Sequence, residues 1–233
     1  MKRSLMGLFG CLLATSALAQ GPVYSVNIVG FNKHVLERGK LYMIATAFED
    51  VGTDGVLALR ANDVFGNQLP NGTTVNYYHP SSTNDLTPYD QDAKNFAGWS
   101  SNIVFQGFMG FWVKTPATPA GAPYELVMKG QVPMDGSSSN LVGGGLNMLG
   151  YPYTADVKFT NTGLFASSIN GDQLFVWDGA ITNYNPPAGF SKNFAGWGPA
   201  TNLTLRMGVP FWYKRNSGSP ILETEVRPYP PAN

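Results

Sequence analysis

Carboxylate side chains are the residues of this sequence whose type and spacing best suit acid–base chemistry. A pair of carboxylates can hydrolyse glycosides without a histidine, because one donates a proton while the other acts as base or nucleophile. The candidate groups are Asp85, Asp90 and Asp92; Glu49 and Asp50; and Asp172 and Asp178. Asp also favours turns, since its side chain bonds nearby backbone amides. Turn formation suits nearly all these positions, so we predict no catalytic pair.

The first of these groups also has the composition of a cation site. Asp85, Asp90 and Asp92, with Asn84 beside them, bring together the hard oxygen ligands that calcium prefers. The sequence contains no complete calcium-loop signature. Calcium bound by these aspartates therefore remains open, and we predict no other cofactor.

Histidine, the usual acid–base residue near neutral pH, occurs only as His34 and His79. The chain also lacks three catalytic or phosphate-binding signatures: the Gly-x-Ser-x-Gly elbow, the His-Glu-x-x-His metal helix and the Gly-x-x-x-x-Gly-Lys loop. The sequence therefore predicts a protein that is not an enzyme.

Aromatic side chains give a clearer indication of function. Exposed rings bind the apolar faces of sugars, while neighbouring Asn and Asp side chains bond the hydroxyls. The candidate ligand-binding residues are Trp99, Trp197, Phe96, Phe194, Tyr77, Tyr78, Trp177 and Tyr184. The alternative is that Trp99 and Trp197 fill the core, with Gly98 and Gly196 allowing close backbone approach. The sequence leaves both interpretations open.

An internal repeat contains several of these rings. The segment Lys94-Asn95-Phe96-Ala97-Gly98-Trp99 recurs unchanged 98 residues later as residues 192–197. Matching Phe-Trp-x-Lys segments begin at Phe111 and Phe211, and matching Leu-x-Met segments begin at Leu41 and Leu146. Neighbouring side chains in a strand point to opposite faces, so Phe111 is expected to enter a core while Trp112 makes an inter-repeat or inter-subunit contact, or the reverse. The same holds for Phe211 and Trp212.

Around these segments the sequence has the period of strands. Residues 24–28 alternate apolar and polar side chains, and the runs 174–177 and 181–184 flank Asp178-Gly179, which is typical of a hairpin turn. Residues 56–61 and 164–169 could each form one or two helical turns. We therefore predict an all-β fold of two tandem sandwich- or barrel-like repeats with short helical connections.

The repeats are expected to span residues 22–134 and 146–233. Residues 135–145, with three serines followed by three glycines, have a linker composition. The pattern Tyr24-x-Val26-x-Ile28-x-Gly30 also aligns with residues 124–130, and residues 221–226 resemble a degenerate third copy. These patterns predict a strand that recurs in each repeat.

Residues 1–19 are typical of an export signal. Lys2 and Arg3 precede an apolar run too short to span a bilayer, and Ala17-Leu18-Ala19 forms a small-x-small cleavage site. Acylation at Cys11 is the alternative processing. The chain after residue 19 has 13 basic and 15 acidic residues and no cysteine, so we expect neither disulfides nor nucleic-acid binding. No later apolar run is long enough for a membrane helix.

Several motifs together resemble a family of exported proteins from Verrucomicrobia-type bacteria. They are the Val-Tyr-Ser-Val-Asn-Ile-Val-Gly-Phe start at residues 23–31, the turn at residues 69–75, the Trp-Asp-Gly hairpin at residues 172–179 and the Gly-x-x-Phe-Trp strands. Residues 77–80, Tyr-Tyr-His-Pro, replace the Trp-Asp-Gly hairpin in the first repeat. The resemblance implies export and a tandem β architecture. It implies no catalytic residues, because that family has no established activity.

We expect an exported, non-catalytic module in the periplasm, at the cell surface or outside the cell, which binds a carbohydrate polymer through the Trp99 and Trp197 loops. One alternative is a self-assembling surface protein whose edge strands, residues 24–28 or 221–226, pair between copies. Another is a small glycoside-active enzyme.

Overall fold

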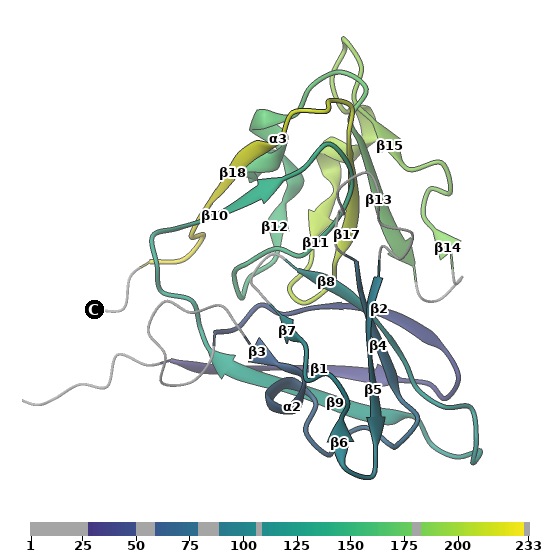
Figure 1. Cartoon of the computed structure of the whole chain (residues 1–233). Coiled ribbons are helices and arrows are strands. Elements are labelled where there is room, and N and C mark those ends of the chain that lie inside the picture. Colours follow the sequence, from purple (N-terminus) through teal and green to yellow (C-terminus); the bar gives the residue numbers. More distant parts are fainter. Residues whose placement is uncertain (1–27, 50–58, 79–88, 106–108, 179–182, 231–233) are drawn as a thin grey trace, which may run out of the picture.

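The chain folds into several antiparallel sheets with a few short helical turns, as a computed structural model shows (Figure 1). The structure describes residues 28–49, 59–78, 89–105, 109–178 and 183–230. The all-β fold class is therefore confirmed. Within the described ranges, no helix has the length and apolar character needed to cross a membrane.

The first half, β1 to β9, contains a five-stranded sheet in the order β2-β8-β4-β5-β6. Its strands are β2 (Leu41–Ala45), β8 (Gly110–Lys114), β4 (Thr74–Tyr78), β5 (Tyr89–Asn95) and β6 (Gly98–Trp99). A two-stranded ribbon pairs β1 (Val29–Leu36) with β9 (Tyr124–Gln131), and β3 (Leu59–Arg60) pairs with β7 (Val104–Phe105). The short helix α2 (Ala61–Val64) follows β3.

The second half, β10 to β18, has the corresponding strand order. Its larger sheet runs β11-β17-β13-β14, with β15 also paired to β13. These strands are β11 (Gly145–Leu149), β17 (Phe211–Arg215), β13 (Gln173–Asp178), β14 (Asn183–Tyr184) and β15 (Phe190–Ser191). The remaining pairs are β10 (Ser137–Val142) with β18 (Ile221–Val226), and β12 (Val157–Lys158) with β16 (Thr204–Leu205).

Short helical turns lie beside the strands of each half, and one of the two predicted segments, residues 164–169, contains most of α3. The other, residues 56–61, was wrong in its described part, because Leu59–Arg60 is strand β3 and only Ala61 is helical. In the second half the helical turns are η2 (Phe159–Asn161), α3 (Gly163–Ser167) and η3 (Gly198–Asn202). The Thr162 hydroxyl caps α3 by accepting a hydrogen bond from the Phe165 amide, 3.1 Å away. In the first half, α2 begins at Ala61, where the segment predicted to be helical ends.

The register of the two larger sheets also corresponds. Met43 lies opposite Trp112 in the first half, and Met148 lies opposite Trp212 in the second. The predicted hairpin around Asp178-Gly179 is present, since Trp177 pairs with Tyr184 and Asp178 pairs with Asn183. The residues between these pairs lie outside the described ranges.

Two sequence interpretations require correction. Residues 135–145 are not a flexible linker, because they contain β10, which pairs with β18 along its whole length. Residues 124–130 are not a second copy of the first strand. They form the strand that pairs with it, with Gly30 opposite Gly130. Since β18 pairs with β10 as β9 pairs with β1, residues 221–226 correspond to β9.

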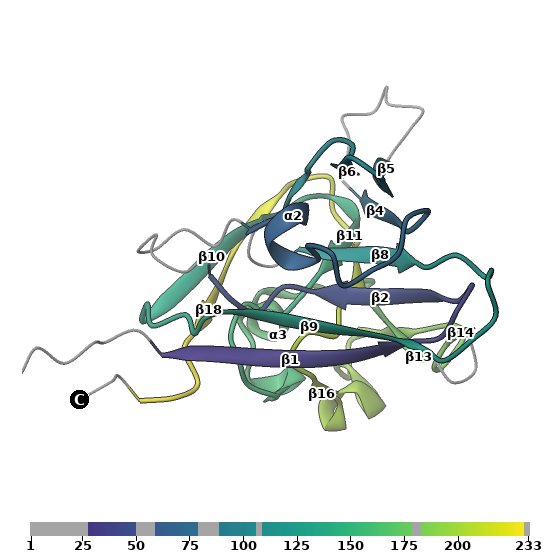
Figure 2. The ribbon, with the colours of Figure 1, turned by 90° about the horizontal axis from the view of Figure 1, so that it is seen from below.

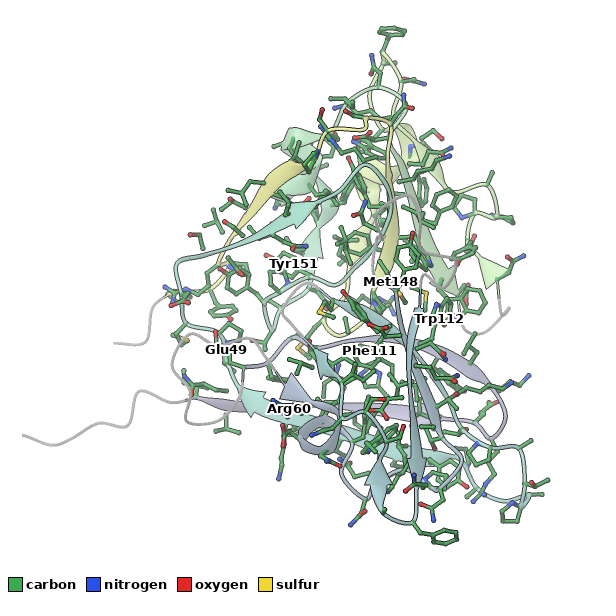
Figure 3. All side chains as sticks on the ribbon, in the orientation of Figure 1. Glu49, Arg60, Phe111, Trp112, Met148 and Tyr151 are labelled. Atoms are coloured by element: carbon green, nitrogen blue, oxygen red, sulfur yellow. The ribbon has the colours of Figure 1, made fainter. Side chains whose placement is uncertain are left out.

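Each half has its own apolar core, and a third cluster joins the two halves. Phe111 and Phe211 enter the first and second cores, whereas Trp112 and Trp212 lie in the joining cluster with Met43 and Met148. Figure 3 labels Trp112 and Met148 at this junction, and Phe111 beneath it. The adjacent aromatic residues are thus divided between a core and the contact that joins the two halves.

Contacts across the junction are reciprocal. The Trp112 ring of the first half meets Trp177 of the second, with ring centres 5.2 Å apart. The Trp212 ring of the second half meets Tyr78 of the first at 4.9 Å. Tyr78 and Trp177 end corresponding strands, β4 and β13. Each half therefore contributes a central Trp and a strand-end aromatic ring.

Candidate functional site

A cleft lies beside the end of β13 in the second half of the chain. Its volume is about 590 Å³, which falls in the range of small-molecule sites. Its walls come from the end of β13, from Asn185 and from the chain that leads through β16 to the start of β17. The lining residues are Val176, Trp177, Asp178, Asn185, Asn202, Leu203, Thr204, Leu205, Arg206, Val209, Pro210 and Phe211.

Strand alternation places the polar side chains of one wall. Asn202, Thr204 and Arg206 are exposed, while Leu205 between them is buried in the second core. Residues two apart in an extended chain share a face, so Thr204 and Arg206 belong to the same side of the segment, whereas Asn202 ends η3. This wall therefore includes the Asn202 amide, the Thr204 hydroxyl and the Arg206 guanidinium group.

The opposite wall is positioned by the β13–β14 hairpin. The Asn185 amide donates a hydrogen bond to the Val176 carbonyl, 3.0 Å away. The Asn185 side-chain amide in turn donates to a carboxylate oxygen of Asp178 at 3.3 Å. These bonds fix the Asn185 amide and the Asp178 carboxylate relative to each other at the end of β13.

Trp177 is packed edge-to-face between two rings. Its ring centre lies 5.2 Å from that of Trp112 and 5.3 Å from that of Tyr184, at interplanar angles of 88° and 78°. Its indole Nε1 is buried and has no hydrogen-bond partner among the described residues. The indole nitrogens of Trp99 and Trp212 are buried in the same way, so this feature does not distinguish Trp177 as a ligand-binding residue.

Trp99 and Trp197, by contrast, belong to the cores. Their exposed fractions are 6% and 2%, and they pack at 5.0 Å on Phe65 and Phe159 respectively. The Trp197 indole also donates to the Ser168 hydroxyl at 2.9 Å. The prediction that sugars stack on Trp99 and Trp197 is therefore wrong, because the cores cover both rings.

The rest of the repeated hexapeptide builds a tight turn. In both copies the Asn side chain accepts a hydrogen bond from the Ala amide, at 2.7 Å for Asn95 and 2.8 Å for Asn193. Gly98 and Gly196 have φ angles of 112° and 105°, which favour glycine. Phe96 and Phe194 project fully into solvent, with 99% of each exposed.

The lysines of the hexapeptides are also used structurally. Lys94 Nζ donates to the Leu69 carbonyl at 2.7 Å, and Lys192 Nζ donates to the Ser168 carbonyl at 2.6 Å. Burial lowers the pKa of the Lys94 ammonium group. In each copy the phenylalanine is thus the large side chain left for a ligand to contact.

The predicted tyrosines are partly buried. Tyr78 packs on Trp212 and Tyr184 packs on Trp177, so both rings support the junction of the halves. Tyr77 lies opposite Asp90 across β4 and β5. Burial, and next the nearby Asp90 carboxylate, raise the pKa of Tyr77. Trp177 is the one of these four strand-end residues that lines the cleft.

The predicted calcium ligands have different environments. Asp92 is buried and accepts hydrogen bonds from the Ser100 hydroxyl at 2.9 Å and the Ser101 and Ile103 amides at 2.8 and 3.1 Å. Asp90 is exposed, and Asp85 lies outside the described residues. In the part of the chain that the structure describes, no three His, Cys, Asp or Glu side chains group as metal ligands. The described bonds give Asp92 a structural role.

The other carboxylate candidates are also separated. Asp172 is buried and accepts from the Asn216 amide at 2.7 Å and from the Tyr213 hydroxyl. Burial, then the bond to Asp172, raise the pKa of Tyr213. Asp172 and Asp178 flank the length of β13, about 20 Å at 3.3 Å per residue, too far for a glycosidase pair. Glu49 is buried in a bridge to Gln131, and Asp50 lies outside the described ranges.

Sequence reasoning missed a buried carboxylate pair, Glu223 and Glu225 of β18. Both are 3% exposed, and Glu225 Oε1 accepts a hydrogen bond from the Gly163 amide at 3.0 Å. Burial, and next a hydrogen bond to Glu225, raise the pKa of Glu223 above its usual range. The alternation in Ile221–Val226 was the available signal, since two glutamates share one face of a predicted strand.

The sequence also gave no reason to select Asn202, Thr204 and Arg206. The strand beside them, β16, has only two residues, which is too short to show an alternation of apolar and polar side chains.

Comparisons with protein-family models, with curated proteins and with solved structures found no match for this chain.

Proposed function

We propose that this protein is an exported, non-catalytic module that binds a neutral carbohydrate polymer, and that the cleft beside Trp177 is its binding site. The observation that carries the proposal is the composition of the cleft. Its lining residues include Trp177 together with side chains that carry amide, hydroxyl, guanidinium and carboxylate groups, around a volume of about 590 Å³. Sugars present apolar C–H faces and many hydroxyls, and this combination of side chains complements both.

The charge of the cleft favours a neutral ligand. Its described lining has one cation, Arg206, and one anion, Asp178. The Asp178 carboxylate would repel a strongly anionic polymer, and the Arg206 guanidinium group would repel a polycation. Asn185, Asn202 and Thr204 add uncharged donors and acceptors, which is the chemistry of hydroxyl recognition.

The exposed Phe96 and Phe194 rings support the same proposal in a secondary way. Both rings are fully accessible in identical turns. Each ring offers a separate surface on which a sugar ring of a polymer could stack.

The experiment measures retention on insoluble neutral polysaccharides such as cellulose, chitin and β-glucan. We expect Asn202→Ala and Arg206→Ala each to weaken binding about tenfold, which corresponds to about 1.4 kcal/mol. Both side chains are exposed, so the unfolding midpoint should remain unchanged. Lys158→Ala is the matched control, because Lys158 is an exposed cation on β12 that does not line the cleft.

Two results would contradict the proposal. Equal retention of all three variants would show that the cleft does not bind the polysaccharide. Release of reducing ends that Asp178→Asn abolishes would show that the cleft is catalytic.

A further inference from the structure

One turn of the second half forms part of the cleft wall and also contacts the first half. The Val209 amide donates a hydrogen bond to the Arg206 carbonyl at 3.1 Å, which closes the turn over Met207 and Gly208. Gly208 has a φ angle of 72°, which favours glycine. Arg206 and Val209, at the two ends of the turn, line the cleft. A movement of this turn therefore moves part of the cleft wall.

The middle of the turn lies against the first half. The Gly208 carbonyl accepts a hydrogen bond from the amide of Ala45, at the end of β2, at 3.0 Å. On its other side Gly208 meets two side chains of β1, the strand that lies beside β9 in Figure 2. A Cβ atom added at Gly208 would lie 2.3 Å from Asn32 Nδ2 and 3.4 Å from His34 Nε2. The first half thus supports a wall of the cleft that belongs to the second half.

The contact between Asn32 and His34 requires a neutral imidazole ring. Asn32 Nδ2 lies 3.2 Å from His34 Nε2. A side-chain amide nitrogen can only donate, so Nε2 accepts this hydrogen bond and the ring carries its proton on Nδ1. A second proton on Nε2 would remove the acceptor and set two donors against each other beside Gly208.

The surroundings of His34 also disfavour a charged ring. The side chain is half-buried, and Leu126, directly opposite it on β9, belongs to the first core. Burial lowers the pKa of the His34 imidazole, because the cation loses its hydration. The next residue on the same face of β9 is Tyr124, whose ring lies 4.2 Å below the Arg38 guanidinium carbon.

The charged groups of the neighbouring segments have other partners or carry positive charge. Lys33 Nζ lies 2.6 Å from a Glu125 carboxylate oxygen, and Lys33 adjoins His34 in the strand, so this pair lies on the opposite face of the ribbon. Asp156 is exposed and accepts a hydrogen bond from the backbone of the turn at 2.9 Å. Arg206, at the start of the turn, is a cation, and a like charge disfavours a second cation nearby.

We propose that the neutral His34 side chain positions the Arg206–Val209 turn of the cleft, and that acidification releases this turn and weakens ligand binding. The inference rests on the proposed function, since it concerns regulation of the same carbohydrate site. A half-buried imidazolium recovers hydration when the turn moves away from β1. Ligand and proton therefore oppose each other, because the ligand binds the cleft in which the turn is in place.

The first measurement is retention on cellulose, chitin and β-glucan at pH 7.5 and at pH 5, a range above the ordinary pKa values of carboxyl groups. We expect native retention to be at least about fivefold weaker at pH 5, the lower end of typical coupling between two sites. His34→Gln cannot gain the charge, so its retention should be equal at both pH values. The matched control is His79→Gln, at the other histidine of the chain, which should keep the native pH dependence.

The second measurement follows the turn without carbohydrate. An NMR titration from pH 7.5 to pH 5 records the His34 ring and the backbone amides of Met207 and Gly208. We expect the two amide resonances to change with the same midpoint as the His34 ring, and to lose this change in His34→Gln. Circular dichroism at pH 5 establishes that the strands are retained.

Three results would overturn the proposal. They are native retention that is equal at both pH values, a pH dependence that persists in His34→Gln, and turn amides that do not follow the His34 ring. The last is expected if the Asn32 amide is flipped, because its Oδ1 would then accept from Nε2 in both charge states. Loss of all retention, with turn amides that still follow His34, would instead contradict the proposed carbohydrate binding and leave the coupling supported.

Discussion

In both copies of the repeated hexapeptide the Trp side chain is buried and the Phe side chain is exposed. The Trp ring lies in a core, and the Phe ring two residues after the Lys is fully exposed. Burial of Lys94 and Lys192 nitrogens against backbone carbonyls and the Asn-capped turn orient the segment. Packing therefore explains the identity of Lys, Asn, Gly and Trp but not that of Phe.

We expect Trp197→Ala to destabilise the protein by about 3–5 kcal/mol, because it leaves a cavity beside Phe159 and removes the donor to Ser168. Phe194→Ala should change the free energy of unfolding by less than about 0.5 kcal/mol, since the ring is fully exposed. Urea unfolding measures both. Comparable losses in the two variants would contradict the assignment of Trp197 to the core.

Sequence reasoning at the scale of these residues identified the right segments but could not orient the rings. The hexapeptide pattern is the same for a core residue and for a ligand-stacking residue. Only the position of Phe65 and Phe159, which come from distant parts of the chain, shows that Trp99 and Trp197 are covered.

At the scale of elements, local patterns predicted the β13–β14 hairpin and α3, but not α2, because the segment predicted to be helical there contains β3. The β13–β14 hairpin follows from Asp-Gly between two apolar runs, and α3 follows from a short apolar segment. The serine-rich β10 was missed because its composition is that of a linker. Its strand conformation depends on pairing with β18, more than 80 positions away in the sequence, as the Ser139–Thr224 contact shows.

The glutamates on the inner face of β18 make stability depend on pH. The pKa of Glu223 is higher in the folded protein than in the unfolded chain, because burial disfavours the carboxylate. Above about pH 4.5 the unfolded chain releases this proton while the folded protein keeps it. Stability therefore falls as pH rises above that value, by at most about 1.4 kcal/mol per pH unit.

We expect Glu223→Gln to be more stable than the native protein at pH 8 and to show a flatter dependence between pH 5 and pH 8. Chemical unfolding across this range measures the effect. Glu125→Gln, at an exposed glutamate of β9, is the comparison variant. A variant that keeps the native slope would show that Glu223 is already ionised.

For the whole molecule, the two halves are joined by aromatic rings that include Tyr78 and Trp177, which the sequence predicted to lie near strand ends. The adjacent Phe-Trp residues predicted a division between core and interface, and the structure has that division. The sequence could not show that Trp177 and Tyr78 are the partners across the junction, because pairing between halves leaves no local pattern. It also could not show the cleft, whose walls meet only after both chain segments are folded.

We expect the halves to unfold together, with coincident transitions by circular dichroism and by tryptophan fluorescence. A double-mutant cycle of Trp112→Phe and Trp177→Phe should give a coupling energy of about 0.5–1.5 kcal/mol, since the rings are in edge-to-face contact. The pair Trp112→Phe and Trp197→Phe is the control, because these residues belong to different clusters. Additive effects in the first cycle would mean that the Trp112–Trp177 contact does not stabilise the junction.

The reciprocal junction has the form of a homodimer interface contained within one polypeptide. Trp112 contacts Trp177, and Trp212 contacts Tyr78. Each half therefore contributes one Trp from the middle of a strand and one ring from the end of a strand. A chain with only one half would expose its Met and Trp to water, and two such chains could cover each other by the same exchange. Because both partners are fused, one of them can change its strand-end loop to acquire a cleft while the other continues to supply the contact.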